Sequence, residues 1–416
     1  MPSAPSRMDP SRSAWLWAAA VFLAACLAFA GTLSYPFVHD DLTVIGLNPL
    51  VQEPGRALEA FRSEYWGMRL DDPGRDRLYR PLTVLTLALN RAWGGSDPGG
   101  YRALNILLHA LASLLLLLVA RRMGMEQAHA GAVALLFALH PLHTEAVNAV
   151  VARADLMAAI GVFAGMALLR GRAVPAGATG GGEEAPPQRR EKEAPGPSAG
   201  MGEKVAAGAG VALALLFGLL SKEAGAALLL FAGAWWLWCR AAGWKGGPRG
   251  LSLAAWAGMG GALLLYLSLR YAALGLWVRP VPPSRLDNPL AHAGALERIW
   301  GALGVLGRYL KLHLWPWPLS LDYSYAQVMP GGAATALFAL AGLAALAAWG
   351  WLAWKWREES PSVGLGLALF LAAYLLDAAS RRPNIPGRSD LVQLAQRYRE
   401  HWRLMARNGA AIFFDP

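Results

Sequence analysis

Apolar residues gather into long blocks along most of the chain, and short charged segments separate the blocks. The blocks are rich in Ala, Leu and Gly and run for roughly 16 to 24 residues, which is long enough to cross a bilayer as a helix. In lipid a segment must pair its own backbone polar groups, so the blocks are interpreted as helices rather than strands. The pattern therefore predicts an all-α fold, a polytopic bundle of about nine spanning helices. The predicted spans are residues 14–34, 101–120, 128–140, 147–169, 205–220, 224–239, 251–274, 333–354 and 363–376.

Basic residues beside the blocks predict how the chain is oriented. Arg7 and Arg12 precede the first block, and Arg121 and Arg122 follow the second. Because short cytoplasmic segments are enriched in Lys and Arg, both of these positions are expected in the cytoplasm. The polar residues 35–100 would then lie at the outer face.

The spacing of polar and apolar segments predicts four parts of the chain. The predicted parts are an N-terminal transmembrane module at 1–170 with a first external loop at 35–100, a disordered cytoplasmic linker at 171–204, a C-terminal transmembrane module at 205–378 with an external segment at 277–325, and a basic tail at 379–416. The linker is assigned because it is rich in Gly, Pro, Ala, Glu and Arg without hydrophobic periodicity. If Lys355 and Arg357 lie in the cytoplasm, the basic tail lies outside, unless residues 298–316 also cross the membrane. The orientation of the last two spans therefore stays open.

Composition changes this picture little. The formal net charge of +10 could suggest nucleic acid, but the excess Lys and Arg flank the apolar blocks, where membrane topology explains them. The two cysteines, Cys26 and Cys239, form neither a CxxC motif nor a disulfide framework. The sequence also contains no P-loop or HExxH motif, so these two markers of soluble nucleotide-binding and metal-dependent hydrolytic enzymes are missing.

An acidic pair directly follows the first span. His39, Asp40 and Asp41 are consecutive at the predicted outer surface. Two neighbouring carboxylates spread their pKa values, which leaves one of them better able to accept a proton from an attacking hydroxyl. The pair could also hold a metal ion. The alternatives are a solvated loop, or a helix capped by Asp41.

A second polar motif, HPLHTEAV, separates two predicted spans. His140, His143 and Glu145 are close enough in sequence to chelate a divalent ion, since imidazole and carboxylate both suit zinc or manganese. The alternative is a helix end at Pro141 with polar neighbours, and no fourth ligand is visible in the sequence. The sequence therefore leaves open whether the protein binds a divalent cation.

Charged residues also interrupt or flank later spans. Arg153 and Asp155 lie two positions apart in a predicted helix, so they cannot face each other, and each needs another partner. Lys222 and Glu223 could bind a phosphate or form a turn with snorkelling side chains. Arg80 suits bidentate contact with a phosphate, against the alternative of an ordinary interfacial arginine.

Taken in order, these segments resemble the transmembrane and tetratricopeptide-repeat O-mannosyltransferase family, a branch of the GT-C glycosyltransferases, and its bacterial relatives. The motifs that carry the resemblance cover about residues 14–330. They are FVHDD with NPLV (37–51), YRPLTVLTLALN (79–90), GYRALNILLHALASLLL (100–116), LLFALHPLHTEAVNAVVARADLMA (135–158), LLSKEAG (219–225), and DNP followed by YLKLHLWPWPLSLDYSY (287–325). One departure is that no helical repeat of about 34 residues follows the predicted spans.

The resemblance implies a GT-C glycosyltransferase in a bacterial inner membrane, with its site on the outer face. It implies a sugar donor carried on polyprenyl phosphate, with mannose expected as the sugar, and a protein or lipid hydroxyl as the acceptor. Asp40 or Asp41 would be the general base of an inverting transfer, as in protein O-mannosylation. The donor phosphate would be held by Lys222, Arg80 and Arg153, and the remaining candidates would shape the site: His39, His140, His143, Glu145, Asp155 and Glu223.

Two functions of other classes remain as alternatives. A non-catalytic membrane scaffold would tolerate loss of every acidic residue near Asp40. A transporter with the charged pairs lining a pathway should show internal hydropathy symmetry and helices broken at matching positions in two halves, and the sequence shows no convincing repeat.

Overall fold

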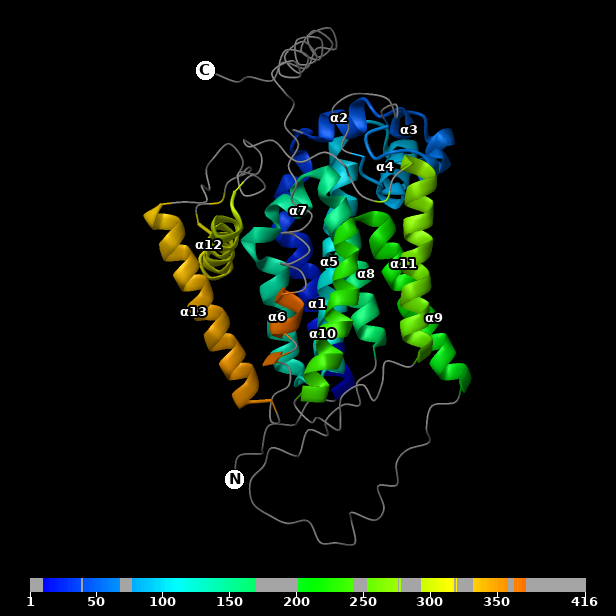
Figure 1. Cartoon of the computed structure of the whole chain (residues 1–416). Helices are drawn as coiled ribbons and strands as arrows, with labels where there is room; N and C mark the ends of the chain where they lie inside the picture. Colours follow the sequence, from blue (N-terminus) through cyan, green and yellow to red (C-terminus); the bar gives the residue numbers. More distant parts are fainter. Residues whose placement is uncertain are drawn as a thin grey trace, which may run out of the picture.

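The computed structural model describes residues 10–38, 40–67, 77–169, 201–241, 253–275, 277, 293–317, 319, 332–357, 363–364 and 366–371. Within these ranges the secondary structure is entirely helical (Figure 1). The elements are α1 (Pro10–Phe29), η1 (Ala30–Ser34), α2 (Asp40–Gly46), α3 (Pro49–Gln52), η2 (Pro54–Arg62), α4 (Pro81–Gly94), α5 (Pro98–Arg122), α6 (Gln127–Leu139), η3 (Pro141–His143), α7 (Thr144–Asn148), η4 (Val150–Ala152), α8 (Arg153–Leu168), α9 (Met201–Ser221), η6 (Glu223–Ala226), α10 (Ala227–Ala241), α11 (Leu253–Leu274), α12 (Ala295–Leu314) and α13 (Ala333–Lys355).

Six helical stretches in the described residues are long and apolar enough to cross a membrane: 11–34, 98–122, 150–168, 201–221, 253–274 and 333–355. The stretch 127–139 joins 141–148 at a bend of 46°, and this pair makes a seventh if it is counted as one span. The prediction of an all-α polytopic membrane protein is thus confirmed.

The number of spans differs from the nine expected. The apolar stretch 223–238 is a shorter helix than the six, and the predicted span at 128–140 ends at the bend before Pro141, because proline has no backbone N–H to donate to a helix. Of the predicted span at 363–376, only part is described. The predicted linker at 171–204 and basic tail at 379–416 lie outside the described residues, except that α9 begins at Met201.

Small residues let the central helices approach closely. A Cβ atom added at Gly161 of α8 would lie 2.7 Å from the backbone oxygen of Ala214 in α9. On the other side of α9, Gly208 and Gly258 bring α9 and α11 together, where a Cβ at Gly258 would lie 3.0 Å from the Gly208 oxygen. Backbones that touch in this way gain dispersion contacts that larger side chains would prevent. Helices α8, α9 and α11 therefore pack closely in this order.

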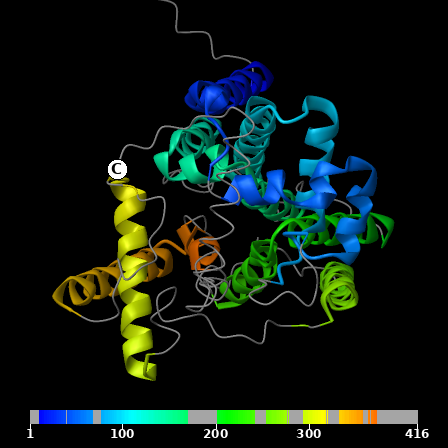
Figure 2. The same cartoon turned by 90° about the horizontal axis from the view of Figure 1, so that it is seen from above.

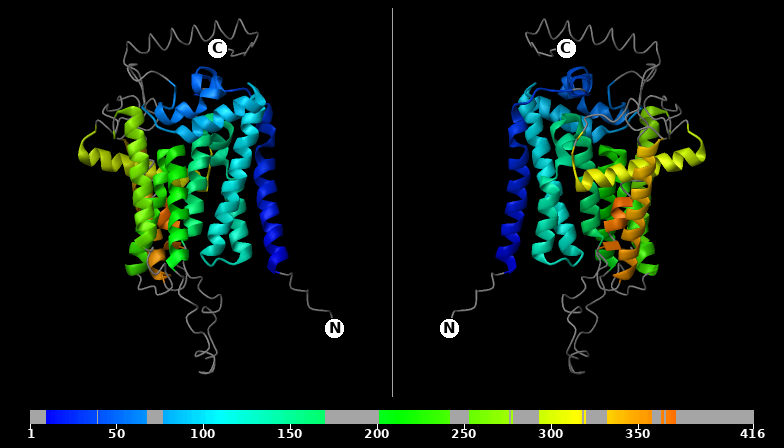
Figure 3. Two further views of the ribbon diagram at one scale, coloured as in Figure 1. Left: turned by 90° about the vertical axis from the view of Figure 1, so that its right-hand side faces the viewer. Right: turned by 90° about the vertical axis from the view of Figure 1, so that its left-hand side faces the viewer.

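The described part of the predicted external loop at 35–100 forms a folded helical layer at one end of the bundle (Figures 1 and 3). Its apolar side chains form a core of their own, which includes Val44, Ile45, Tyr65 and Leu87. Asn48 caps α3 by accepting a hydrogen bond from the Leu50 amide at 3.0 Å, and it donates to the Tyr65 carbonyl at 2.9 Å. The polar composition of this loop concealed the short helices, because capping residues and prolines separate them.

Helix α12 occupies much of the predicted external segment 277–325 and lies across the bundle axis (Figures 2 and 3). It packs on α13 through Gly304, where an added Cβ would lie 2.7 Å from the Thr335 methyl group. Its exposed apolar residues include Leu296 and Leu314, at 84% and 86% exposure. An amphipathic helix in this attitude suits the membrane interface rather than a crossing of the bilayer.

Candidate functional site

The acidic pair begins helix α2, and its two carboxylates have different surroundings. Asp40 is exposed, whereas Asp41 is fully buried. Asp41 accepts hydrogen bonds from the backbone amides of Val151 at 2.9 Å and Val38 at 3.4 Å. Burial raises the pKa of Asp41, and these backbone hydrogen bonds oppose the rise. Asp41 therefore ties the start of α2 to the η4 segment, and Asp40 faces outward beside it. His39 lies outside the described residues.

Lys222 and Asp155 form an ion pair where α8 begins and α9 ends. The Lys222 ammonium group lies 2.6 Å and 2.7 Å from the two carboxylate oxygens of Asp155. The side chains are 26% and 43% exposed, so the pair borders solvent-accessible space. Of the two partners that Lys222 could take, a protein carboxylate or a ligand phosphate, the structure places a carboxylate on it.

Glu223 joins two arginines from distant parts of the chain. Its Oε2 atom accepts from Nε and Nη2 of Arg80, at 3.2 Å and 3.1 Å. Its Oε1 atom lies 3.5 Å from Nη1 of Arg270, near the end of α11. Nearby, the Thr83 hydroxyl donates to the Ser221 carbonyl at 2.9 Å, so the start of α4 rests directly on the end of α9. Glu223 therefore orders two cations at one place.

Tyr65 shows that these groups converge. Its ring lies 5.3 Å from the Arg80 guanidinium, in a cation–π contact. Burial is the main cause that raises the pKa of Tyr65; Arg80 opposes the rise, and the nearby charges of Asp40, Asp41 and Asp155 add to it. The acidic pair, Arg80 and Asp155 are thus electrostatic neighbours of one buried ring.

Arg153 occupies a different place from the other cations. It is fully buried, and Nε and Nη2 donate to the side-chain oxygens of Asn105 at 2.9 Å and Asn90 at 2.7 Å. Further bonds go to the carbonyls of Thr86 and Tyr101, each at 3.0 Å. Four oxygens thus use its donors, and its role is to join α4, α5 and α8 from within.

The HPLHTEAV motif does not gather into a chelate. Nε2 of His140 lies 3.0 Å from the His313 carbonyl, and its Nδ1 accepts from the Leu142 amide at 3.2 Å. His143 packs its ring against Phe137, with centroids 4.3 Å apart, and Glu145 is exposed. Among the described residues, no group of three His, Cys, Asp or Glu side chains could hold a metal ion. Both nitrogens of His140 already have backbone neighbours.

Sequence reasoning missed Arg270 and Tyr65. Arg270 is only 8% exposed and lies within the apolar block at 251–274. A charged residue inside a predicted span is costly and usually paired, so its position alone was a usable signal. Tyr65 offered none, because a tyrosine in a polar loop is ordinary.

No family model matches the chain, and no solved structure matches it. Three similar proteins are the human protein O-mannosyl-transferase TMTC1, 40% identical over 140 residues, its Drosophila melanogaster counterpart Tmtc1, 40% identical over 143 residues, and human TMTC4, 37% identical over 150 residues. Each match covers 33% of this chain and 16%, 17% and 20% of the respective relative.

The chain thus matches about a fifth or less of the length of these relatives. The comparisons therefore confirm, over a third of the chain, the resemblance to the TMTC protein O-mannosyl-transferase family.

Proposed function

We propose that this chain is a membrane glycosyltransferase that moves a mannosyl group from a polyprenyl phosphate to a hydroxyl group of a protein acceptor. The supporting observation is that an exposed carboxylate, Asp40, acts on the same buried Tyr65 ring as Arg80 and Asp155. The cations Lys222 and Arg270 belong to the same cluster through their ion pairs with Asp155 and Glu223. The names of the similar proteins favour mannose and a protein acceptor over other sugars and lipid acceptors.

In the proposed chemistry a carboxylate acts as the general base, and cations stabilise the leaving phosphate. Asp40 accepts the proton of the acceptor hydroxyl as the oxygen attacks the anomeric carbon, and the bond from that carbon to the phosphate oxygen breaks with inversion. Negative charge grows on the leaving phosphate, so cations placed there stabilise the transition state more than the ground state. Arg80 and Lys222 are the proposed phosphate ligands, and Arg153 is left out because its donors are occupied inside the bundle.

Before the donor binds, Arg80 and Lys222 are paired with the carboxylates of Glu223 and Asp155. These ion pairs keep the two cations from being left without an anion before the donor binds. A donor phosphate must share the cations with Glu223 and Asp155 or displace these carboxylates. A scaffold role would not require this balance of charge at the same place as an exposed carboxylate. Direct assay of the full chain with labelled polyprenyl-phosphate mannose and peptide acceptors tests the proposal, and absence of transfer with every donor tried would favour the scaffold.

Lys222→Met should weaken donor binding by about 10- to 100-fold, as expected if a charge-assisted hydrogen bond of about 1.5 to 3 kcal/mol is lost. The substitution keeps the apolar stem and removes the charge. Titration of the purified protein with polyprenyl-phosphate mannose measures the change, and Lys311→Met, at the exposed end of α12, is the control. Unchanged donor affinity with reduced protein yield would leave Lys222 as a structural partner of Asp155 alone.

The proposed orientation places the helical layer of residues 40–67 outside the cell and the start of α1 inside. A cysteine at Leu58, which is 72% exposed, should react with an impermeant maleimide added to intact cells. His129 lies near the start of α6, and its side chain is 72% exposed. A cysteine at this position should react only after the membrane is permeabilised. The reverse labelling pattern would move the proposed site to the cytoplasm.

A further inference from the structure

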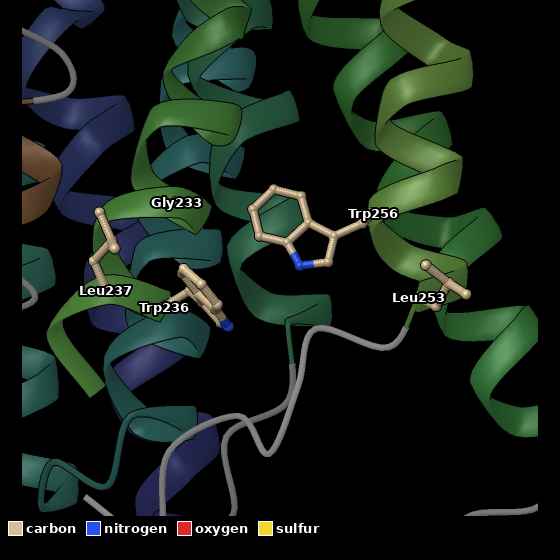
Figure 4. A pocket seen from close by; sticks show the side chains of 5 residues that line it. All are labelled: Gly233, Trp236, Leu237, Leu253 and Trp256. Atoms are coloured by element: carbon tan, nitrogen blue, oxygen red, sulfur yellow. The ribbon is translucent and has the colours of Figure 1, made fainter. Parts of the chain in front are cut away.

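A pocket with an apolar lining lies between α10 and α11, in the halves of these helices that point away from Glu223 and Arg270. Its volume is about 550 Å³, and Gly233, Trp236, Leu237, Leu253 and Trp256 line it. Figure 4 shows the indole of Trp256 reaching from α11 toward α10, where Gly233, Trp236 and Leu237 lie. The size falls within the range of about 300 to 1,000 Å³ that is typical of small-molecule sites.

The helix surfaces around the pocket leave room for a long chain. A Cβ atom added at Gly233 or at Gly260 would meet no other atom within 4 Å. Gly260 lies four residues after Trp256, so the open side of α11 continues along the helix beyond the pocket. Leu237 and Leu253 are 61% and 85% exposed, and the pocket therefore opens sideways, where a spanning helix meets lipid.

One rim of the pocket is cationic. The guanidinium of Arg240, in the last turn of α10, lies 4.9 Å from the ring centroid of Trp236, which is a pocket residue. Arg240 is exposed, and among the described residues no carboxylate forms an ion pair with it. An arginine held by an indole at the end of an apolar helix is suited to a lipid phosphate at the membrane surface.

We propose that this pocket binds a membrane phospholipid with an anionic headgroup, with one acyl chain between α10 and α11 and the phosphate on Arg240. The lining is apolar apart from the indole N–H groups of Trp236 and Trp256, which suits an acyl chain, and the cationic rim favours an anionic headgroup over a zwitterionic one. The site is separate from the donor site proposed above, and its test measures lipid binding without sugar transfer.

Native mass spectrometry of the detergent-solubilised full chain, titrated with phosphatidylglycerol and separately with phosphatidylcholine, tests the proposal. Arg240→Gln should weaken phosphatidylglycerol binding about fivefold and phosphatidylcholine binding by less, because both lipids carry a phosphate but only phosphatidylglycerol has a net negative charge. Gly233→Leu should fill the pocket without displacing a neighbour and weaken both lipids alike.

Two matched controls separate this pocket from general effects of charge and volume. Arg357→Gln removes an arginine that stacks 4.5 Å from the Trp354 ring at the end of α13, and Gly350→Leu fills equally open space on α13. Both should bind lipid as the unaltered chain does. The proposal is wrong if Arg357→Gln loses as much affinity as Arg240→Gln, or if Gly233→Leu loses none. It is also wrong if polyprenyl phosphate occupies the pocket in preference to phosphatidylglycerol.

Discussion

Replacing Asp40 by Asn should lower sugar transfer by about 10²- to 10⁴-fold, the range that a positioned general base contributes. The carboxamide keeps the size of the side chain but cannot accept a proton at neutral pH. Because Asp40 is exposed at the start of α2, the substitution should leave the folding of the bundle unchanged. Initial rates with labelled polyprenyl-phosphate mannose measure the loss.

The control for Asp40→Asn is Asp97→Asn at the same end of the bundle. Asp97 caps α5 by accepting from the Gly100 amide at 3.1 Å, and asparagine can accept this hydrogen bond as well. Asp97→Asn should therefore retain full activity. Equal rates in the two variants would remove Asp40 from the mechanism.

Asp41→Asn should behave differently, with its main effect on stability. The amide nitrogen of the new side chain would face a backbone N–H, either that of Val151 or that of Val38, and one buried hydrogen bond would be lost. Leaving such a donor without an acceptor costs about 1–3 kcal/mol. Denaturant unfolding in micelles measures this change. If Asp41→Asn abolished transfer while unfolding as the unaltered chain does, the base would be Asp41 instead.

The sequence predicted which residues carry charge at this end but not how they pair. Each apolar block is long enough to predict a helix, and the charged residues that flank it can be read directly from the sequence. The Lys222–Asp155 pair joins residues 67 positions apart, and the Arg80–Glu223 pair joins residues 143 apart. Such pairings depend on which helices pack together. Small residues allow this packing, but the sequence does not show which helix each of them contacts.

Burial of individual charges was equally hidden from sequence reasoning. Arg80 and Arg153 both lie beside apolar stretches with polar neighbours in the sequence. Arg80 nevertheless pairs with Glu223, whereas Arg153 is fully buried. Arg153 can be enclosed because Asn90 of α4 and Asn105 of α5 supply side-chain oxygens that accept its hydrogen bonds. Asparagines within two separate apolar stretches predict that a buried donor lies between them, but they do not show which residue supplies this donor.

Replacing Glu223 by Gln should lower the free energy of unfolding by about 1 to 3 kcal/mol, between the values for exposed and fully buried ion pairs, because the Glu223 side chain is 29% exposed. Glu223 is the shared counter-charge of Arg80 and Arg270, whose side chains are 16% and 10% exposed. A carboxamide has one acceptor oxygen, so one guanidinium would face an N–H group rather than an oxygen. Denaturant unfolding in mixed micelles, followed by circular dichroism, measures the change.

Glu59→Gln is the matched control, because Glu59 pairs with Arg56 on the surface at 2.9 Å, closer than the 3.5 Å between Glu223 and Arg270. Distance alone would predict the larger loss at Glu59. Its side chain is 51% exposed and Arg56 is 46% exposed, however, and water replaces such a contact, so the expected loss is below about 1 kcal/mol. Removing Arg80 as well, in Arg80→Gln with Glu223→Gln, should recover part of the stability that Glu223→Gln loses, because one fewer cation is then left without its anion. Equal losses at Glu223 and Glu59 would mean that the cluster is solvated, and Glu223 would then not be what holds the two arginines in place.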